Sequence, residues 1–225
     1  MAIEPTIASA PPVGRPRAEF VLAVLAVLSL ALIPIQVTTI YSGLPAHPLF
    51  LHIPVILIPA ATIWALVLVA RPAWFVRSGV LLGIVTVVAL AGTFLTIGAG
   101  EALRNALHLN GGFGPAALVA RHAHAASILR LLLIAFTAVL IVALLAHRIA
   151  AGMATGQAAL DDLLHRPAML ISLRVLLGVL AVACAYFVFH TGDLGAKAVW
   201  QGRLQGGGPG GGGGPVPQLF SPGGG

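Results

Sequence analysis

Histidine is the residue type of this sequence that could do the most chemistry, and its eight copies are unevenly placed. Imidazole titrates near neutral pH and is a common ligand of haem iron, copper and zinc. An ionisable side chain at membrane depth costs about 3 kcal/mol and therefore indicates a functional site by default. If the long apolar runs of the chain span a membrane, six histidines fall on one side of it, which we call the outer side: His47, His52, His108, His122, His124 and His190.

Haem b is the cofactor that these histidines predict, because it needs only two imidazole ligands, which two helices of a bundle can supply. The first predicted ligand is His52, which lies about one turn inside the second apolar run. His47 precedes that run, so we expect it nearer to water, as a proton carrier or a partner of a haem propionate. The remaining candidate ligands are His122 as the second axial partner, His190 or His47 as its substitutes, and His124.

Cations on the outer side are the expected partners of the haem propionates, since guanidinium and ammonium groups bind carboxylates at the water boundary. Three such residues lie close to the candidate ligands in the chain: Arg121, Arg130 and Lys197.

A zinc or copper site is the rival interpretation. His122 and His124 are two residues apart, so in a helix they point to different sides and chelate poorly, although a loop could bring them together. Only Glu101 and Asp193 supply carboxylates on the outer side, which argues against a hard ion such as Ca²⁺ or Mg²⁺.

Composition places these residues in a membrane protein. The chain is 59% hydrophobic and 8% charged, with a mean hydropathy of +1.02, whereas soluble domains carry about 25% charged residues. Its net charge of +6 is scattered between apolar runs, which is typical of membrane anchors and not of a nucleic-acid surface. The single cysteine, Cys184, excludes a covalent c-type haem and a Cys-ligated iron–sulfur cluster within this chain.

The apolar runs predict an all-α integral membrane bundle of five transmembrane helices, each long enough to cross about 30 Å of hydrocarbon. We expect a cytoplasmic tail over 1–18, an N-terminal transmembrane helix within 19–42, a four-helix membrane domain over 43–204 and a disordered Gly/Pro-rich tail over 205–225. The predicted spans are Phe20–Tyr41, Phe50–Ala70, Val76–Gly98, Ser127–His147 and Met169–His190.

Lysines and arginines predict the orientation of these spans. More of them fall on the side that holds the N-terminus than on the outer side, which indicates a cytoplasmic N-terminus and a C-terminus outside. The expected location is the inner membrane of a bacterium, in a multi-pass arrangement.

Three stretches resemble a known family. "GLPAHPLFLHIPVILIP", "RHAHAASILR" and "TGDLGAKAVW" are similar to motifs of the bacterial membrane-protein family called Domain of Unknown Function 2231, and together they cover Gly43 to about Trp200. The resemblance implies a four-helix membrane domain that is found fused to Rieske-type or cytochrome-type domains, and so electron transfer by small haem b membrane cytochromes. In that comparison His47 and His52 match the two histidines of the first motif, and His122 matches the third better than His124.

The sequence therefore predicts a membrane electron-transfer protein, a b-type cytochrome whose haem lies near the outer face. We expect an electron-transfer subunit and not a stand-alone enzyme, with quinone or an extracytoplasmic redox protein of Rieske or cytochrome type as its partner. The alternatives are a non-redox assembly or accessory subunit of a larger membrane complex and a small transporter. Polar residues inside the predicted spans are mostly Thr and Ser, which offers little of the polar path that a transporter needs.

Overall fold

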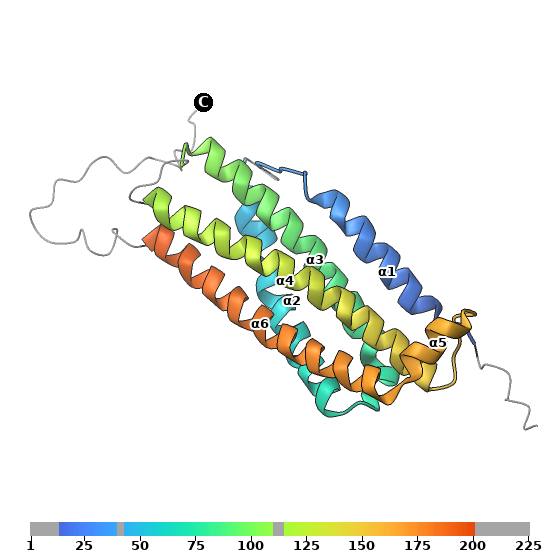
Figure 1. Ribbon diagram of the computed structural model, residues 1–225. Coiled ribbons are helices and arrows are strands. Elements are labelled where there is room, and N and C mark those ends of the chain that lie inside the picture. The colour runs from blue at the N-terminus through green and yellow to red at the C-terminus, as the bar shows by residue number, and fades with distance from the viewer. Residues whose placement is uncertain (1–13, 40–42, 110–114, 201–225) are drawn as a thin grey trace, which may run out of the picture.

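The computed structural model describes residues 14–39, 43–109 and 115–200, and within those ranges the regular structure is helical (Figure 1). The all-α class predicted from the apolar runs is therefore confirmed for the described residues. The predicted tail over 205–225 and most of the tail over 1–18 lie outside them. The elements are α1 (Arg17–Ser29), the 3₁₀ helix η1 (Leu30–Leu32), α2 (Ala46–Ala70), α3 (Trp74–Ala106), α4 (Pro115–Ala150), α5 (Ala158–His165) and α6 (Pro167–Trp200).

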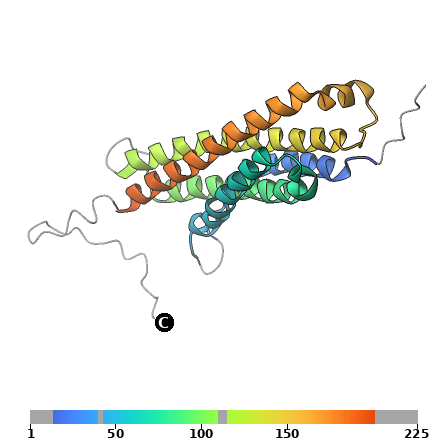
Figure 2. The ribbon, with the colours of Figure 1, turned by 90° about the horizontal axis from the view of Figure 1, so that it is seen from below.

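Four of these helices, α2, α3, α4 and α6, are long and apolar enough to cross a membrane. Each packs against two others, so that α2 and α4 both lie between α3 and α6. Successive helices run in opposite directions along the bundle, and α2 crosses its neighbours more steeply than they cross one another (Figures 1 and 2). We call the end where α2 and α4 begin the outer end and the opposite end the inner end.

The prediction of a fifth transmembrane helix over Phe20–Tyr41 is wrong. The helix in this region, α1, has 13 residues, which extend about 20 Å, whereas a span needs about 30 Å. After Ser29 the chain tightens into η1 and then leaves the helical conformation. Pro34 explains the end of the helix, because it has no N–H to donate and its ring clashes with the carbonyl of the preceding turn.

The segment over 14–39 nevertheless runs along the length of the bundle. At its start, the amide of Ala154 donates a 3.2 Å hydrogen bond to the carbonyl of Gly14 at the inner end. At its finish, the amide of Ala46 donates a 3.0 Å bond to the carbonyl of Thr38 at the outer end. Between these points α1 lies against α3 and α4 (Figure 1).

Glycines let neighbouring elements approach α3, which is the most enclosed of the four long helices. A Cβ atom on Gly79 would collide with Leu144 of α4, and one on Gly83 would collide with Leu22 of α1. The contacts of these two glycines fit close helix packing, in which small residues let neighbouring helices approach.

The outer connection between α3 and α4 is shorter than the sequence predicted, because both helices extend beyond the apolar runs. α3 continues to Ala106, and α4 begins at Pro115 instead of near Ser127. This places both His122 and His124 inside a helix.

Candidate histidine-pair site

His47 lies in the first turn of α2, where its ring packs against α3. Its Nδ1 is 2.9 Å from the carbonyl oxygen of Thr96. One turn further along α3, a Cβ atom placed on Gly100 would lie 2.9 Å from the same Nδ1. The ring therefore occupies a seat that exists because position 100 has no side chain, and it is half-buried there.

His122 occupies an equivalent seat between α4 and α6. Its Nδ1 is 2.8 Å from the carbonyl oxygen of Thr191. A Cβ atom on Gly195 would lie 3.1 Å from the ring. Each histidine thus packs on a Thr-x-x-x-Gly turn, Thr96–Gly100 in one hairpin and Thr191–Gly195 in the other. The hairpins α2–α3 and α4–α6 repeat one local arrangement at the outer end of the bundle.

The two imidazoles lie close together across the bundle. Their ring centroids are 6.3 Å apart and their planes are nearly perpendicular, at 88°. Because a carbonyl oxygen can only accept, the hydrogen bonds to Thr96 and Thr191 require a proton on Nδ1 of each neutral ring. Both rings then hold the tautomer whose Nε2 lone pair is free to bind a metal, a second-shell arrangement typical of ligating histidines.

The distance between the rings fits a single metal ion bound by both. A metal–imidazole bond is about 2.0–2.1 Å and the ring centre lies about 1 Å behind the nitrogen, so imidazoles on opposite sides of one ion have centroids about 6 Å apart. Side chains alone supply too few donors for a metal ion. Within 14–39, 43–109 and 115–200, no group of three or more His, Cys, Asp or Glu could hold an ion. Haem iron requires only two axial ligands, since the porphyrin supplies the other four.

Two unpartnered polar atoms lie near the outer end, on the helices that pack against the histidine pair. The hydroxyl of Thr191 is buried without a hydrogen-bond partner in the described part of the chain, next to the carbonyl that binds His122. The same holds for Nε of Arg104, one turn beyond Gly100 on α3 and closer to the outer boundary. Buried polar groups in native proteins are normally paired, so an unpaired one needs an explanation such as a bound water or ion. These two atoms give a ligand polar groups to bind.

The other predicted ligands lie apart from the pair. His52 is exposed, so the side chain expected to face inward faces outward, and His47, expected nearer to water, is the one that faces His122. His124 is also exposed, because two residues along a helix change the direction by about 200°. His190 is stacked on Tyr186 of α6 at 5.7 Å.

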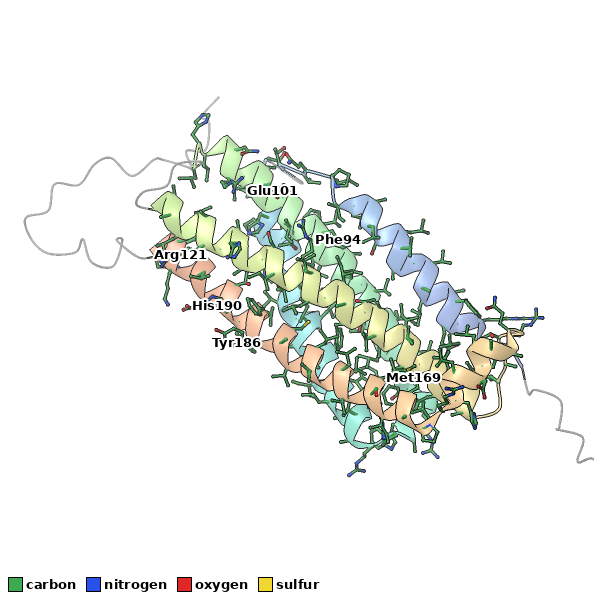
Figure 3. All side chains as sticks on the ribbon, viewed as in Figure 1. Phe94, Glu101, Arg121, Met169, Tyr186 and His190 are labelled. Atoms are coloured by element: carbon green, nitrogen blue, oxygen red, sulfur yellow. The ribbon has the colours of Figure 1, made fainter. Side chains whose placement is uncertain are left out.

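The predicted propionate partners are divided among different surroundings. Arg121 is exposed and, with His124 and His190, lines a groove between α4 and α6; Figure 3 shows Arg121 and His190 at the same end of the bundle. Arg130 is half-buried in α4. Lys197 makes an exposed 2.7 Å ion pair with Asp193.

Sequence reasoning missed two contributors to the site, Gly195 and Arg104, and did not connect Gly100 with His47. The repeated Thr-x-x-x-Gly spacing was a usable signal for the two glycines, because a histidine-bearing helix precedes each copy. Nothing in the sequence distinguished Arg104 from the other cations of the outer side.

Four threonines inside the described part of the bundle bond to their own helices. The hydroxyls of Thr86, Thr93 and Thr96 each donate to the carbonyl four residues earlier in α3, at 2.7–2.9 Å. Thr137 does the same in α4. These hydroxyls are satisfied by their own helices, which is the usual arrangement in apolar surroundings.

Comparisons of the chain with models of protein families, with curated proteins and with solved structures find no match. The functional interpretation therefore depends on the geometry of this site and on the sequence patterns.

Proposed function

We propose that this protein is a membrane electron-transfer protein of the b-type cytochrome kind, with one haem held between His47 and His122. The observation that supports this most directly is the pair of imidazoles at 6.3 Å, each oriented by a backbone carbonyl through Nδ1. Bound haem would supply one-electron chemistry, cycling between ferric and ferrous iron. The proposed pair keeps His122 from the sequence prediction and replaces His52 by His47.

The number of donors favours haem over the rival zinc or copper site. Structural zinc takes four protein ligands and catalytic zinc takes three. The described residues bring only two imidazoles together at this end of the bundle. A cofactor that carries most of its own ligands is the one that such a pair can hold.

Residues of this chain would set the properties of the site. The hydrogen bonds from Nδ1 to Thr96 and Thr191 fix the ring orientations and make both imidazoles better ligands. Arg104, whose Nε is buried without a partner among the described residues, is the cation that we propose for a propionate, with Arg121 and Arg130 as further choices.

Electron partners follow from the position of the pair at the outer end. A quinone in the bilayer and an extracytoplasmic redox protein could both approach that end, if it faces the outside of a bacterial inner membrane as the arginine distribution predicts. The resemblance of Gly43–Trp200 to a family with Rieske-type and cytochrome-type fusions points the same way.

The test is an absorption spectrum of the full chain, expressed with a haem supply and purified in detergent. We expect a Soret band, an alpha band on reduction with dithionite, and one haem per chain by pyridine haemochrome. His47→Ala and His122→Ala should abolish haem retention. Their matched controls, His52→Ala and His124→Ala, change exposed histidines of the same two helices and should keep it.

Three results would contradict the proposal. A wild-type protein without a Soret band rules out haem b and leaves a non-redox accessory subunit. Full haem occupancy in His47→Ala together with its loss in His52→Ala restores the ligand predicted from the sequence. Zinc or copper in place of iron, measured by mass spectrometry of the metals, replaces the proposed cofactor.

A further inference from the structure

A groove of about 490 Å³ lies between α4 and α6 on the surface of the bundle, near its outer end. Its polar part is formed by Arg121 and His124 from α4 and by His190 from α6. Its apolar part continues along Ile128 and Phe187. From Arg121 to Ile128 the helix rises about 10 Å, so the groove is polar toward the water boundary and apolar toward the middle of the bilayer.

The polar side chains of the groove are all able to donate hydrogen bonds, and no carboxylate lines it among the described residues. Asp193, the nearest acid on α6, is paired with Lys197 at 2.7 Å. A guanidinium and two imidazoles suit a head group that presents acceptor oxygens.

Aromatic rings form the α6 side of the groove. Phe187 meets His190 edge to face, with centroids 6.2 Å apart. Tyr186 lies outside the lining of the groove but stacks on His190, nearly parallel to it and with ring centroids 5.7 Å apart; Figure 3 shows Tyr186 and His190 together on α6. Flat aromatic walls favour a planar ring, which distinguishes the expected head group from the tetrahedral phosphate of a phospholipid.

We propose that this groove binds the head group of a membrane quinone, with His190, His124 and Arg121 donating to the two carbonyl oxygens and the isoprenoid tail lying over Ile128. A quinone unites the three features that the groove selects: a planar ring, acceptor oxygens at the water boundary and an apolar tail. The proposal rests on the proposed function only in giving that function an electron partner, since quinone binding itself requires no haem.

The groove and the histidine pair share the same stretches of backbone. Arg121 and His124 flank His122 in α4, and His190 directly precedes Thr191, whose carbonyl accepts from His122. A head group in the groove is therefore connected to the pair through one residue of α6 and one hydrogen bond. Only the contact between α4 and α6 would then separate the quinone in the groove from the haem at the histidine pair.

Photolabelling tests the site. The full chain in detergent is irradiated with an azido-quinone that carries a short isoprenoid tail, and the labelled peptides are identified by mass spectrometry. We expect labels within 120–128 and 187–194 that excess unlabelled quinone displaces. His190→Leu should weaken labelling about fivefold, the loss expected for one hydrogen bond.

A matched pair of alanines controls for non-specific effects. Ala120→Trp should block the groove, because Ala120 lines it. Ala138→Trp adds the same side chain to the same face of α4, since a separation of 18 positions makes about five full turns, and Ala138 is likewise exposed but deeper in the bilayer. Labelling should be lost in the first variant and retained in the second.

Three results would overturn the proposal. The labels could be spread evenly over the long helices, or labelling could survive in Ala120→Trp. The third result is displacement of the label by phospholipid but not by quinone. The haemless variant His47→Ala separates the two proposals. Retained quinone labelling there, with no haem in the wild type, overturns the cytochrome and leaves the quinone site. A wild-type protein that is loaded with haem but not labelled in the groove overturns the quinone site and leaves the cytochrome.

Discussion

At the scale of single residues, two glycines seat the two imidazoles. Gly100→Ala would place a Cβ atom 2.9 Å from Nδ1 of His47, which forces the ring away from the carbonyl of Thr96. Gly195→Ala would crowd the ring of His122 at 3.1 Å. We expect each substitution to weaken haem binding about 10–100-fold, the range for partners that orient a metal ligand, as measured by haem titration of the apoprotein.

Gly192→Ala is the control for this prediction, because a Cβ atom at Gly192 meets nothing within 4 Å. Gly192 lies in the same helix as Gly195, so Gly192→Ala and Gly195→Ala raise the helix propensity of α6 equally. Equal haem affinity in all three alanine variants would show that the glycines do not position the imidazoles.

At this scale the placement of histidines at the outer end could be predicted from the sequence, but the direction of their side chains could not. The clustering of histidines on the outer side follows from the apolar runs, and the preference for His122 over His124 follows from the family resemblance. His47 and His52 differ by about 140° around a helix, so one had to face inward and the other outward. Which one does depends on where α2 begins: its first residue is Ala46, not a residue near Phe50, and this brings His47 into the helix.

At the scale of elements, one ion pair anchors α1. Glu19 is 3% exposed and accepts a 2.9 Å hydrogen bond from Nε of Arg148 in α4. Removing one member of a buried pair leaves the other charge uncompensated, which costs about 3–5 kcal/mol. We expect the low end for Glu19→Ala, because the Arg148 side chain keeps 20% of its exposure. Amide exchange in α1 should accelerate about 100-fold, the equivalent of about 3 kcal/mol, as measured by mass spectrometry.

The exposed pair between Asp162 and Arg166 is the matched control, at a similar distance of 2.9 Å. Its side chains are 72% and 63% exposed, so it is screened by water and contributes little. If Asp162→Ala and Glu19→Ala change the exchange of their helices by the same factor, burial of the α1 pair does not explain its attachment.

A second element-scale prediction concerns the start of α5. The carboxylate of Asp161 accepts from the amide of Thr155 at 3.0 Å and from its hydroxyl at 2.7 Å. The backbone hydrogen bond, followed by the hydroxyl, holds the pKa of Asp161 below its usual value. A lowered folded-state pKa means that the contact stabilises the loop above the unfolded-state pKa, and that this contribution is lost as pH falls through the folded-state pKa.

Asp161→Ala should therefore speed amide exchange over residues 155–165 at pH 7. The difference in exchange rate between the variant and the wild type should shrink as pH falls below the usual range for aspartate. The wild-type carboxylate is then protonated and no longer stabilises the loop. Exchange rates normalised for their intrinsic pH dependence provide the measurement. A difference that persists unchanged in acid would assign the effect to lost side-chain packing.

Helix existence was predictable and helix termination was not. The four long apolar runs are continuous over enough residues to identify α2, α3, α4 and α6, and those helices are found. The first run is equally apolar, yet α1 stops after 13 residues. Hydropathy counts apolar residues without regard to backbone hydrogen bonds, and Pro34 removes one of these in the middle of the run.

At the scale of the whole molecule, two hairpins of similar design form the bundle. In each, a helix that starts at the outer end presents a histidine, and the returning helix offers a threonine carbonyl and a glycine to it. Joining the hairpins side by side brings the two rings to 6.3 Å, so the site exists only in the assembled bundle. A sequence can show the two halves of such a site, but the distance between them depends on packing of helices distant in the chain.

The last prediction concerns how this assembly sits in the membrane. Single cysteines at Ala73 and His108 lie at exposed positions at the inner and outer ends of α3, and the native Cys184 is buried. Because an antiparallel bundle places these positions on opposite sides, a membrane-impermeant maleimide applied to intact cells should label His108→Cys and spare Ala73→Cys. Gly14→Cys and Thr39→Cys extend the test to the first segment, where we expect only Thr39→Cys to be labelled. Permeabilised cells, in which all four cysteines react, provide the control. The reverse pattern would invert the orientation, and labelling of Gly14→Cys together with Thr39→Cys would mean that the segment over 14–39 does not cross the bilayer.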